Sequence, residues 1–324
     1  MTTKEKLLEL FESNKGSYFS GEEIAGKLNV SRAAVWKAVK ALRSEGYEID
    51  AVTNKGYCLS EKTDILSSQG IRKYLNPEAE SLDITVLSTI DSTNAMVREK
   101  ANFGLAEGYT VISNEQTAGR GRYGRNFFSP NGTGLYMSLL LRPRNDASSQ
   151  AVRITTMAAV AMCEAIEEVS DEKAQIKWVN DIYIRGKKVC GILTEASFGM
   201  ESGMLEYAVL GVGLNVYEPL EGFPKELEQK AGAVFESTQD DVKNRIAAAF
   251  LNRFMEYYRA QDQSPYIEKY RSRSLAIGKE VLVIFANRER KAFVYGVDDD
   301  CHLLVRYEDG ETESLAYGEI SIRV

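Results

Sequence analysis

The sequence predicts a multidomain α+β protein: an N-terminal winged helix-turn-helix, a central mixed α/β domain and a small C-terminal all-β domain. Residues 1–66 combine short helical patterns with a polar hairpin, and residues 67–272 alternate strand and helix patterns. Residues 273–324 are rich in strand patterns and acidic turns. These pattern changes set the expected domain boundaries, and 324 residues suffice for two or three domains of ordinary size.

Composition excludes several classes of function. The one histidine, His302, argues against a histidine-based triad and against metal sites built on several histidines. The four cysteines are scattered without a CxxC pair, which favours a reducing compartment. No apolar run approaches the length of a membrane span, and the first residues lack the apolar segment of a signal peptide. We therefore expect a cytoplasmic protein with no membrane contact and no metal site of its own.

The N-terminal segment has the spacing of a helix-turn-helix. Ser20 and Ser31 are placed to cap two short helices that a tight connection joins. A hairpin with the turn Thr53-Asn-Lys-Gly56 follows, and a helix-turn-helix followed by a hairpin is a winged helix. The residues expected to face DNA, on the second helix and at the hairpin tip, are Ser31, Arg32, Ala33, Trp36, Lys37 and Lys55.

The formal net charge of −7 is unusual for a protein that binds DNA, but it is unevenly distributed. Residues 1–66 hold ten Lys/Arg and ten Asp/Glu, so this segment is neutral. A neutral domain can bind DNA if its basic groups share one face, although a single copy should bind weakly. Because winged helices also bind proteins, a small protein-interaction domain is the alternative. The small residues Ala33 and Ala34 favour close approach to a DNA groove.

The most informative stretch is Gln116-Thr-Ala-Gly-Arg-Gly-Arg-Tyr-Gly-Arg125, where three arginines alternate with three glycines. Glycine lets the backbone approach a ligand, and arginine supplies forked donors for phosphate and carboxylate. The stretch is neither a Walker loop nor a dinucleotide-binding turn. A disordered Arg-Gly loop that binds RNA is the alternative. The aromatic pair Phe127-Phe128 and the strand expected at Leu135–Leu141 favour an ordered ligand-binding loop.

Two further segments place polar residues at strand ends. Lys177-Trp-Val-Asn-Asp181 follows an apolar strand pattern, and a hairpin turn then leads to Lys188, so Asp181 and Lys188 can converge on neighbouring strands. Gly211-Val-Gly-Leu-Asn215 ends another strand. Taken singly, Asp181 and Lys188 are typical of charged residues on a protein surface. The glycine segment is typical of a β-bulge in which Asn215 is buried with its hydrogen bonds made.

The C-terminal segment alternates apolar and polar residues. Val281, Val283 and Phe285 form one alternating set, and Phe293, Tyr295 and Val297 form another. Acidic turns separate the strands, so the pattern alone predicts a five-stranded all-β unit.

In order and spacing, the motifs of this chain resemble those of the bifunctional biotin–protein ligases, also called biotin operon repressors. The resemblance covers nearly the whole length, and the segment Ser31–Lys37 resembles the repressor subclass. It implies a central domain of the biotin/lipoate ligase type and an SH3-like C-terminal barrel. The motifs that carry it are Asp91-Ser-Thr-Asn94, Gln116–Arg125, Lys177–Asp181, Lys187–Leu193 and Gly211–Asn215.

The resemblance also implies roles for individual residues. Lys188 would bridge a biotin carboxylate and a phosphate, with Arg122 beside it. From the chemistry of transfer to a neutral amine, Asp181 is the candidate to orient that amine or accept its proton, and a structural role is the alternative. Phe127 stands where many members carry a tryptophan stacked on adenine. The biotin-binding set is Ser92, Thr93, Asn94, Gln116, Arg120, Gly121, Arg122, Lys188 and Gly191, and the adenylate-binding set is Arg122, Arg125, Phe127 and Asn215.

The implied activity joins biotin and ATP, with Mg²⁺, into biotinyl-5′-AMP. Biotin then passes to a lysine of a biotin carboxyl carrier protein or domain of acetyl-CoA or pyruvate carboxylase. The resemblance further implies a homodimer on operator DNA, with biotinyl-5′-AMP as corepressor. A lipoate-type ligase and a metabolite-sensing repressor without enzyme activity are the alternatives. The arginine-glycine run and the winged helix argue against the first, and the intact Lys188 argues against the second.

Overall fold

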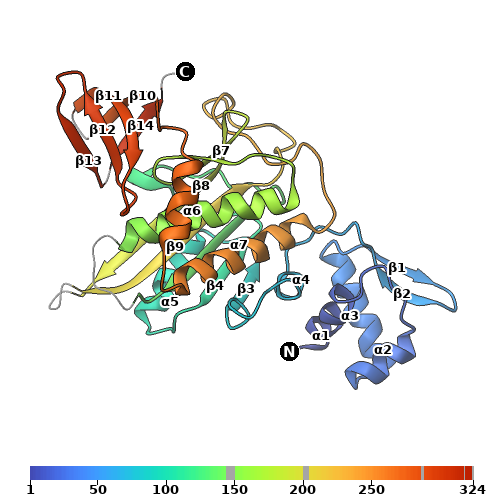
Figure 1. The fold of residues 1–324 in the computed structure, drawn as a ribbon. Coiled ribbons are helices and arrows are strands. Elements are labelled where there is room, and N and C mark those ends of the chain that lie inside the picture. The colour runs from blue at the N-terminus through green and yellow to red at the C-terminus, as the bar shows by residue number, and fades with distance from the viewer. Residues whose placement is uncertain (144–149, 200–203, 286–287, 317, 323–324) are drawn as a thin grey trace.

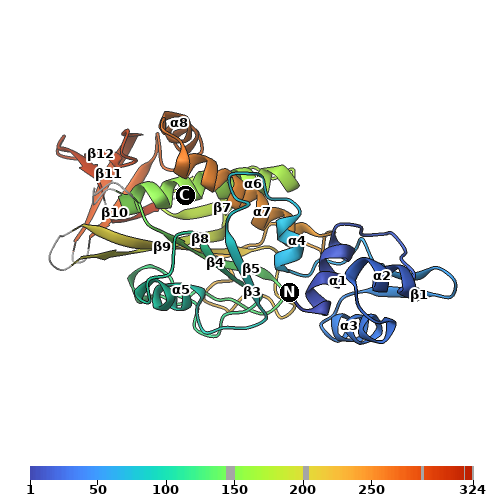
Figure 2. The same ribbon diagram turned by 90° about the horizontal axis from the view of Figure 1, so that it is seen from below.

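A computed structural model shows three parts that follow one another along the chain (Figure 1). The winged helix lies at one end, the central sheet with its helices in the middle, and a second sheet at the other end (Figures 1 and 2). This confirms the predicted multidomain α+β class. No helix in the described parts is both long and apolar enough to cross a membrane. The structure describes residues 1–143, 150–199, 204–285, 288–316 and 318–322.

The N-terminal part is the predicted winged helix, and local sequence explains its elements. The side chains of Ser20 and Ser31 accept hydrogen bonds from backbone amides three residues later, which fixes where two of the helices begin. The hairpin turns through Asn54 and Gly56 at positive φ. The apolar side chains form a core separate from the rest of the chain. The elements are α1 (Thr3–Glu12), α2 (Gly21–Leu28), α3 (Arg32–Ser44), β1 (Ile49–Val52) and β2 (Gly56–Leu59).

A seven-stranded mixed sheet forms the centre, in the order β3-β4-β5-β9-β8-β7-β6. The pair β3 and β4 is parallel, and the other described neighbours are antiparallel. Helices α6 and α7 cover one face, and α5 packs on the other (Figure 2). The elements are α4 (Ser68–Arg72), β3 (Asp83–Leu87), α5 (Thr93–Asn102), β4 (Tyr109–Ser113), a 3-10 turn (Arg122–Gly124), β5 (Gly134–Leu141), α6 (Gln150–Val169), β6 (Gln175–Lys177), β7 (Asp181–Ile184), β8 (Lys187–Phe198), β9 (Leu205–Asn215), α7 (Val242–Arg259) and α8 (Ser264–Ser272).

The C-terminal part is a five-stranded antiparallel sheet in the order β13-β12-β11-β10-β14, which confirms the predicted all-β unit. Its buried side chains belong to the same hydrophobic core as those of the central sheet, so the two parts share their interior. The strands are β10 (Glu280–Phe285), β11 (Arg288–Val297), β12 (Leu303–Tyr307), β13 (Thr312–Leu315) and β14 (Glu319–Ile322).

The alternation of buried and exposed residues shifts within β11. Val281 and Val283 are buried, and the side chain of Phe285 lies outside what the structure describes. On β11, however, Ala292 and Val294 face the core, and the side chain of Tyr295 is 47% exposed. A register shift between Val294 and Gly296 reverses the alternation, so that Val297 is again buried.

Buried charges join the winged helix to the central part. The ammonium of Lys73, just after α4, lies 2.9 Å from Glu12 of α1 and 2.7 Å from Asp241. Lys15, which follows α1, lies 2.9 Å from Asp241. Burial alone would raise the pKa of Asp241, but hydrogen bonds from Lys73, Asn244 and Lys15 hold it below its usual value. We call Glu12, Lys15, Lys73 and Asp241 the interdomain ion cluster; it fixes the winged helix against the central part.

We predict that Asp241→Ala lowers the free energy of unfolding by about 3 kcal/mol, because removing one partner of a buried ion pair leaves the other charges uncompensated. Asp240→Ala is the matched control, since its side chain is exposed beside the cluster. Urea denaturation followed by circular dichroism measures both. Equal stability of the two variants would show that the cluster contributes nothing to the docking.

Candidate functional site

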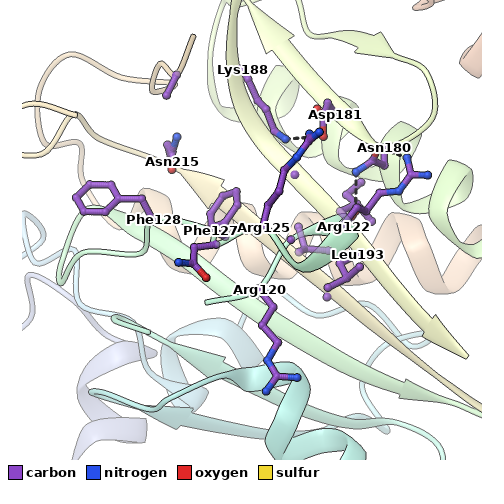
Figure 3. A pocket seen from close by; sticks show the side chains of 18 of the residues that line it. Arg120, Arg122, Arg125, Phe127, Phe128, Asn180, Asp181, Lys188, Leu193 and Asn215 are labelled. Atoms are coloured by element: carbon purple, nitrogen blue, oxygen red, sulfur yellow. Dashed lines mark hydrogen bonds and ion pairs between the residues drawn. The ribbon is translucent and has the colours of Figure 1, made fainter. Parts of the chain in front are cut away.

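A cavity of about 680 Å³ opens on the α5 side of the central sheet. The arginine-glycine loop, the start of α5, strands β6 to β9 and strand β14 all contribute to its wall. Figure 3 shows most of these side chains turned toward the same space. The cavity brings together every residue predicted for the central site: Ser92, Thr93, Asn94, Gln116, Arg120, Gly121, Arg122, Arg125, Phe127, Asp181, Lys188, Gly191 and Asn215.

A single cross-strand row forms the floor of the cavity. Gly213 of β9 is paired with Gly191 of β8, Gly191 with Asp181 of β7, and Asp181 with Lys177 of β6. Directly paired residues of antiparallel strands present their side chains on the same face. A Cβ at Gly213 would lie 2.5 Å from the Phe127 ring and one at Gly191 would lie 3.2 Å from it, so the ring packs closely on both glycines. We call these four residues the floor row.

The arginine-glycine loop is ordered by contacts with neighbouring elements. Arg122 donates one hydrogen bond to the side-chain oxygen of Asn180, at 3.0 Å, and another to the carbonyl of Gly318. Arg125 holds the carboxylate of Glu319 through two hydrogen bonds of 2.9 and 2.8 Å. These bonds lower the pKa of Glu319. The contacts favour the ligand-loop interpretation over a disordered loop, and they tie the loop to the C-terminal sheet.

The predicted convergence of Asp181 and Lys188 is confirmed. Their charged atoms lie 2.6 Å apart, between neighbouring strands β7 and β8 (Figure 3). Both side chains remain partly exposed to the cavity, so a ligand can reach them. In contrast, the side chain of Arg120 points away from this pair and from Arg125 in Figure 3. The ion pair thus marks the charged end of the cavity.

The other end of the cavity is a polar network at the start of α5. Ser92 caps the helix, and both the amide and the hydroxyl of Thr93 donate to the side-chain oxygen of Gln116, at 2.9 and 3.1 Å. The buried hydroxyl of Ser138 lies 2.7 Å from the Thr93 hydroxyl and 2.6 Å from the Asn94 side-chain oxygen. This end offers several oriented donors and acceptors to a small polar ring.

Sequence reasoning gave no role to four residues that hold predicted site residues in place. Asn180 stood inside a quoted motif but received no role, although it holds Arg122. Ser138 lies in a strand that reads as core, and Glu319 lies in the C-terminal sheet. Glu195 of β8 accepts from Asn94 and pairs with Arg98 of α5. Of these, only Asn180 had a local signal, because the motif around it was already recognised.

The residues predicted to face DNA lie together on the winged helix. Arg32, Ala33, Trp36 and Lys37 are all exposed along α3, and Lys55 is exposed at the tip of the hairpin. Trp36 is 55% exposed, which is unusual for a tryptophan in a domain this small. Ser31 caps α3 through its side chain, so its hydroxyl is already engaged with the amide of Ala34.

Comparisons with known proteins agree with this architecture part by part. Residues 86–215 match the biotin/lipoate A/B protein ligase family, residues 3–58 match an HTH domain, and residues 276–323 match the biotin protein ligase C-terminal domain.

Two relatives match the chain from end to end. The bifunctional ligase/repressor BirA of Bacillus spizizenii is 34% identical over 95% of this chain and 95% of its own length. The protein of that name from Escherichia coli K12 is 29% identical over 98% and 96%. A solved biotin protein ligase of Aquifex aeolicus, in complex with biotin and ATP, superimposes with a TM-score of 0.62 at 27% identity, over 74% of this chain and 98% of that one. The chain therefore belongs to the bifunctional ligase/repressor family of biotin protein ligases.

Proposed function

We propose that this chain is an ATP-dependent biotin–protein ligase and also a DNA-binding repressor of biotin genes. The observation that carries the proposal is the single cavity in which a polar network, a glycine floor and a cluster of cations adjoin. The solved relative with both biotin and ATP supports a shared pocket for the two ligands. Residues 67–272 would carry the ligase chemistry, and residues 1–66 would bind the operator.

The first step activates biotin on ATP. A carboxylate is already a nucleophile, so the step needs no general base; its obstacle is repulsion between two anions. Lys188 and Arg122 would neutralise this repulsion and hold the carboxylate in line with the α-phosphate. One carboxylate oxygen bonds to that phosphorus while the bond to pyrophosphate breaks. The product is biotinyl-5′-AMP.

The two ends of the cavity suit the two halves of this product. The polar network of Ser92, Thr93, Asn94 and Gln116 would bind the ureido ring, with Arg120, Gly121 and Gly191 lining the way to the carboxylate. The adenylate would lie against the Phe127 ring, which is seated on Gly213, and beside Asn215, with its phosphate toward Arg122 and Arg125. A phenylalanine offers an apolar face for stacking.

The second step transfers biotin to a carrier protein. A neutral lysine amine attacks the carbonyl carbon of the mixed anhydride, and AMP leaves. When the ligand's anions occupy Lys188, Asp181 would lose its partner and become free to orient the amine and accept its proton. The acceptor would be a biotin carboxyl carrier protein or domain of acetyl-CoA or pyruvate carboxylase.

We propose that Mg²⁺ enters with ATP and is held mainly by its phosphates. Mg²⁺ commonly takes one or two protein carboxylates and keeps several waters. Asp181 and Glu319 are the described carboxylates that line the cavity, which fits such an ion. When bound, it would offset charge on the pyrophosphate side.

We further propose that the protein acts in the cytoplasm, as a homodimer on operator DNA. The four cysteines are buried free thiols, which suits a reducing compartment. One neutral winged helix should bind DNA weakly. In a dimer, binding of the first winged helix holds the second near its half-site, which raises the overall affinity for DNA. Biotinyl-5′-AMP would act as corepressor, persisting when acceptor protein is scarce.

We expect Lys188→Ala to reduce adenylate formation by roughly 100- to 1,000-fold, as removal of a charge-stabilising donor does in other enzymes. Biotin binding should weaken much less than the rate falls. Lys187→Ala is the control, because this exposed neighbour lies outside the cavity wall. Mass spectrometry of biotinyl-5′-AMP, made from biotin, ATP and Mg²⁺, measures both rates. A Lys188→Ala variant as fast as the control would refute the assignment of Lys188, and a wild-type chain that makes no adduct would refute the ligase itself.

For DNA binding, we predict that the double variant Lys37→Ala/Lys55→Ala weakens operator binding. It should also reduce the slope of log affinity against log salt by about 0.9 for each lost phosphate contact. Lys6→Ala/Lys62→Ala removes the same charge from exposed positions on α1 and after β2. Fluorescence anisotropy at several salt concentrations compares the pairs. Identical salt slopes for both double variants would mean that α3 and the hairpin tip do not contact the DNA backbone.

Finally, we predict that biotinyl-5′-AMP shifts the protein from monomer to dimer, and that biotin alone does so less. The adenylate phosphate would add to the contacts that Arg122 and Arg125 already make with Asn180 and Glu319, and so hold the glycine-rich loop more firmly against an ordering cost of about 1–2 kcal/mol per residue. Sedimentation velocity of the free, biotin-bound and adenylate-bound forms measures the equilibrium. The same monomer–dimer equilibrium constant for all three forms would contradict the proposed corepressor role.

A further inference from the structure

The last member of the floor row, Lys177, has no role in the chemistry described so far. Its half-buried side chain lines the cavity at the edge strand β6, with its ammonium 5.9 Å from the centre of the Tyr183 ring. Arg125 and Lys188 are each ion-paired with a carboxylate. Over the described residues, no such ion pair within 4.0 Å involves Lys177. It is therefore a cation that faces the cavity without a bound anion.

Desolvation explains why this charge is costly in the free protein. Burial lowers the pKa of Lys177, and the nearby cations Lys188 and Arg125 lower it further. The carboxylates of Asp181 and Glu319 act in the opposite direction without fully offsetting the burial. A bound polyanion would supply the missing counter-charge.

The charge balance of this end of the cavity points to such a ligand. Four cations, Lys177, Lys188, Arg122 and Arg125, line it together with two carboxylates, Asp181 and Glu319. The net charge of +2 equals in magnitude the charge of one carboxylate and one phosphodiester group, and without Lys177 it would fall to +1. The further phosphates of ATP would therefore leave none of these four cations without an anion.

Register places Lys177 where those groups would extend. The floor row runs from Gly213 through Gly191 and Asp181 to Lys177 on successive strands. With about 4.8 Å between neighbouring strands, the backbone of Lys177 lies about 10 Å beyond that of Gly191. If adenine stacks on the Phe127 ring above Gly213 and the α-phosphate meets Lys188 on β8, the remaining phosphates lie on the side of Asp181 and Lys177.

We propose that Lys177 binds the β- and γ-phosphates of ATP, stabilises pyrophosphate as it leaves, and takes no part in the transfer to the acceptor lysine. This inference rests on the proposed ligase function. In the first step the bond between the α-phosphorus and the bridging oxygen breaks, and its electron pair stays on pyrophosphate. The ammonium of Lys177 meets that added charge. In the second step AMP is the leaving group, pyrophosphate has departed, and Lys177 has nothing to bind.

The test separates the two half-reactions in the full-length protein. Lys177→Met keeps most of the aliphatic stem and removes the charge, and Lys177→Arg keeps the charge. Lys173→Ala, at an exposed position four residues earlier, is the control. The first assay measures pyrophosphate release from biotin and ATP, together with product inhibition by added pyrophosphate. The second supplies synthetic biotinyl-5′-AMP and measures transfer to a carrier domain.

For Lys177→Met we expect pyrophosphate release to fall on the order of 10- to 100-fold, the loss typical of a hydrogen bond to a charged group. The KM for ATP should rise, and inhibition by pyrophosphate should weaken. Transfer from synthetic biotinyl-5′-AMP should stay within about twofold of wild type, because Lys177 has no pyrophosphate to bind in this half-reaction. Lys177→Arg should recover part of the first activity. Thermal melting compares the folding of all variants.

Three outcomes would overturn the assignment: an equal loss in both half-reactions, an unchanged first half-reaction, or a loss that Lys177→Arg does not reduce. If Lys177→Met does not fold, Lys177→Arg and Lys177→Gln are compared by the same two assays. These results are distinct from failure of the ligase function. That function fails if the wild-type chain forms no biotinyl-5′-AMP, whereas the role of Lys177 fails only when the wild type is active.

Discussion

The open face of the central sheet depends on two positions that have no side chain. Gly191 and Gly213 face each other across β8 and β9, and the Phe127 ring lies above them. A methyl group at Gly213 would displace that ring, and with it the arginine-glycine loop to which it belongs. On the opposite face of the same strands, close-packed residues contact α6 and α7. The strands therefore cannot shift toward these helices to accommodate a side chain at either glycine. The glycine backbone therefore seats the Phe127 ring, and the ring forms part of the cavity wall.

Parts of this arrangement could be predicted from sequence because their causes are local. Helix caps such as Ser31, turns such as that at Asn54, and glycine beside arginine all act within a few residues. The motifs also revealed which segments would meet, since each carried chemistry that a lone surface residue would not need. The shift in β11 escaped prediction, because a single bulge reverses the facing of Tyr295 without changing the apolar pattern.

Long-range partners escaped prediction for a different reason. Glu319 meets Arg125, and Glu195 meets Asn94, only because the strands that carry them pack at a particular register and angle. Nothing near either glutamate in the sequence distinguishes it from a solvated surface charge. The interdomain ion cluster is an extreme case, because Glu12 and Asp241 lie far apart in the sequence. Sequence pattern indicates which residues can react, whereas packing decides which residues hold them in place.

The docked winged helix has a consequence for the geometry of the DNA. A DNA-binding domain on a flexible linker could change its orientation and reach half-sites at many separations. Here buried ion pairs hold α1 against the start of α7, so α3 has a set direction relative to the ligase body. Two copies that bind one DNA through a common body contact would then present their recognition helices at one separation and one rotation about the duplex. With a DNA repeat of about 34 Å per turn, half a turn of added sequence would carry the second half-site to the far side of the double helix. The ligase body would thus determine which separation of half-sites the dimer can bind.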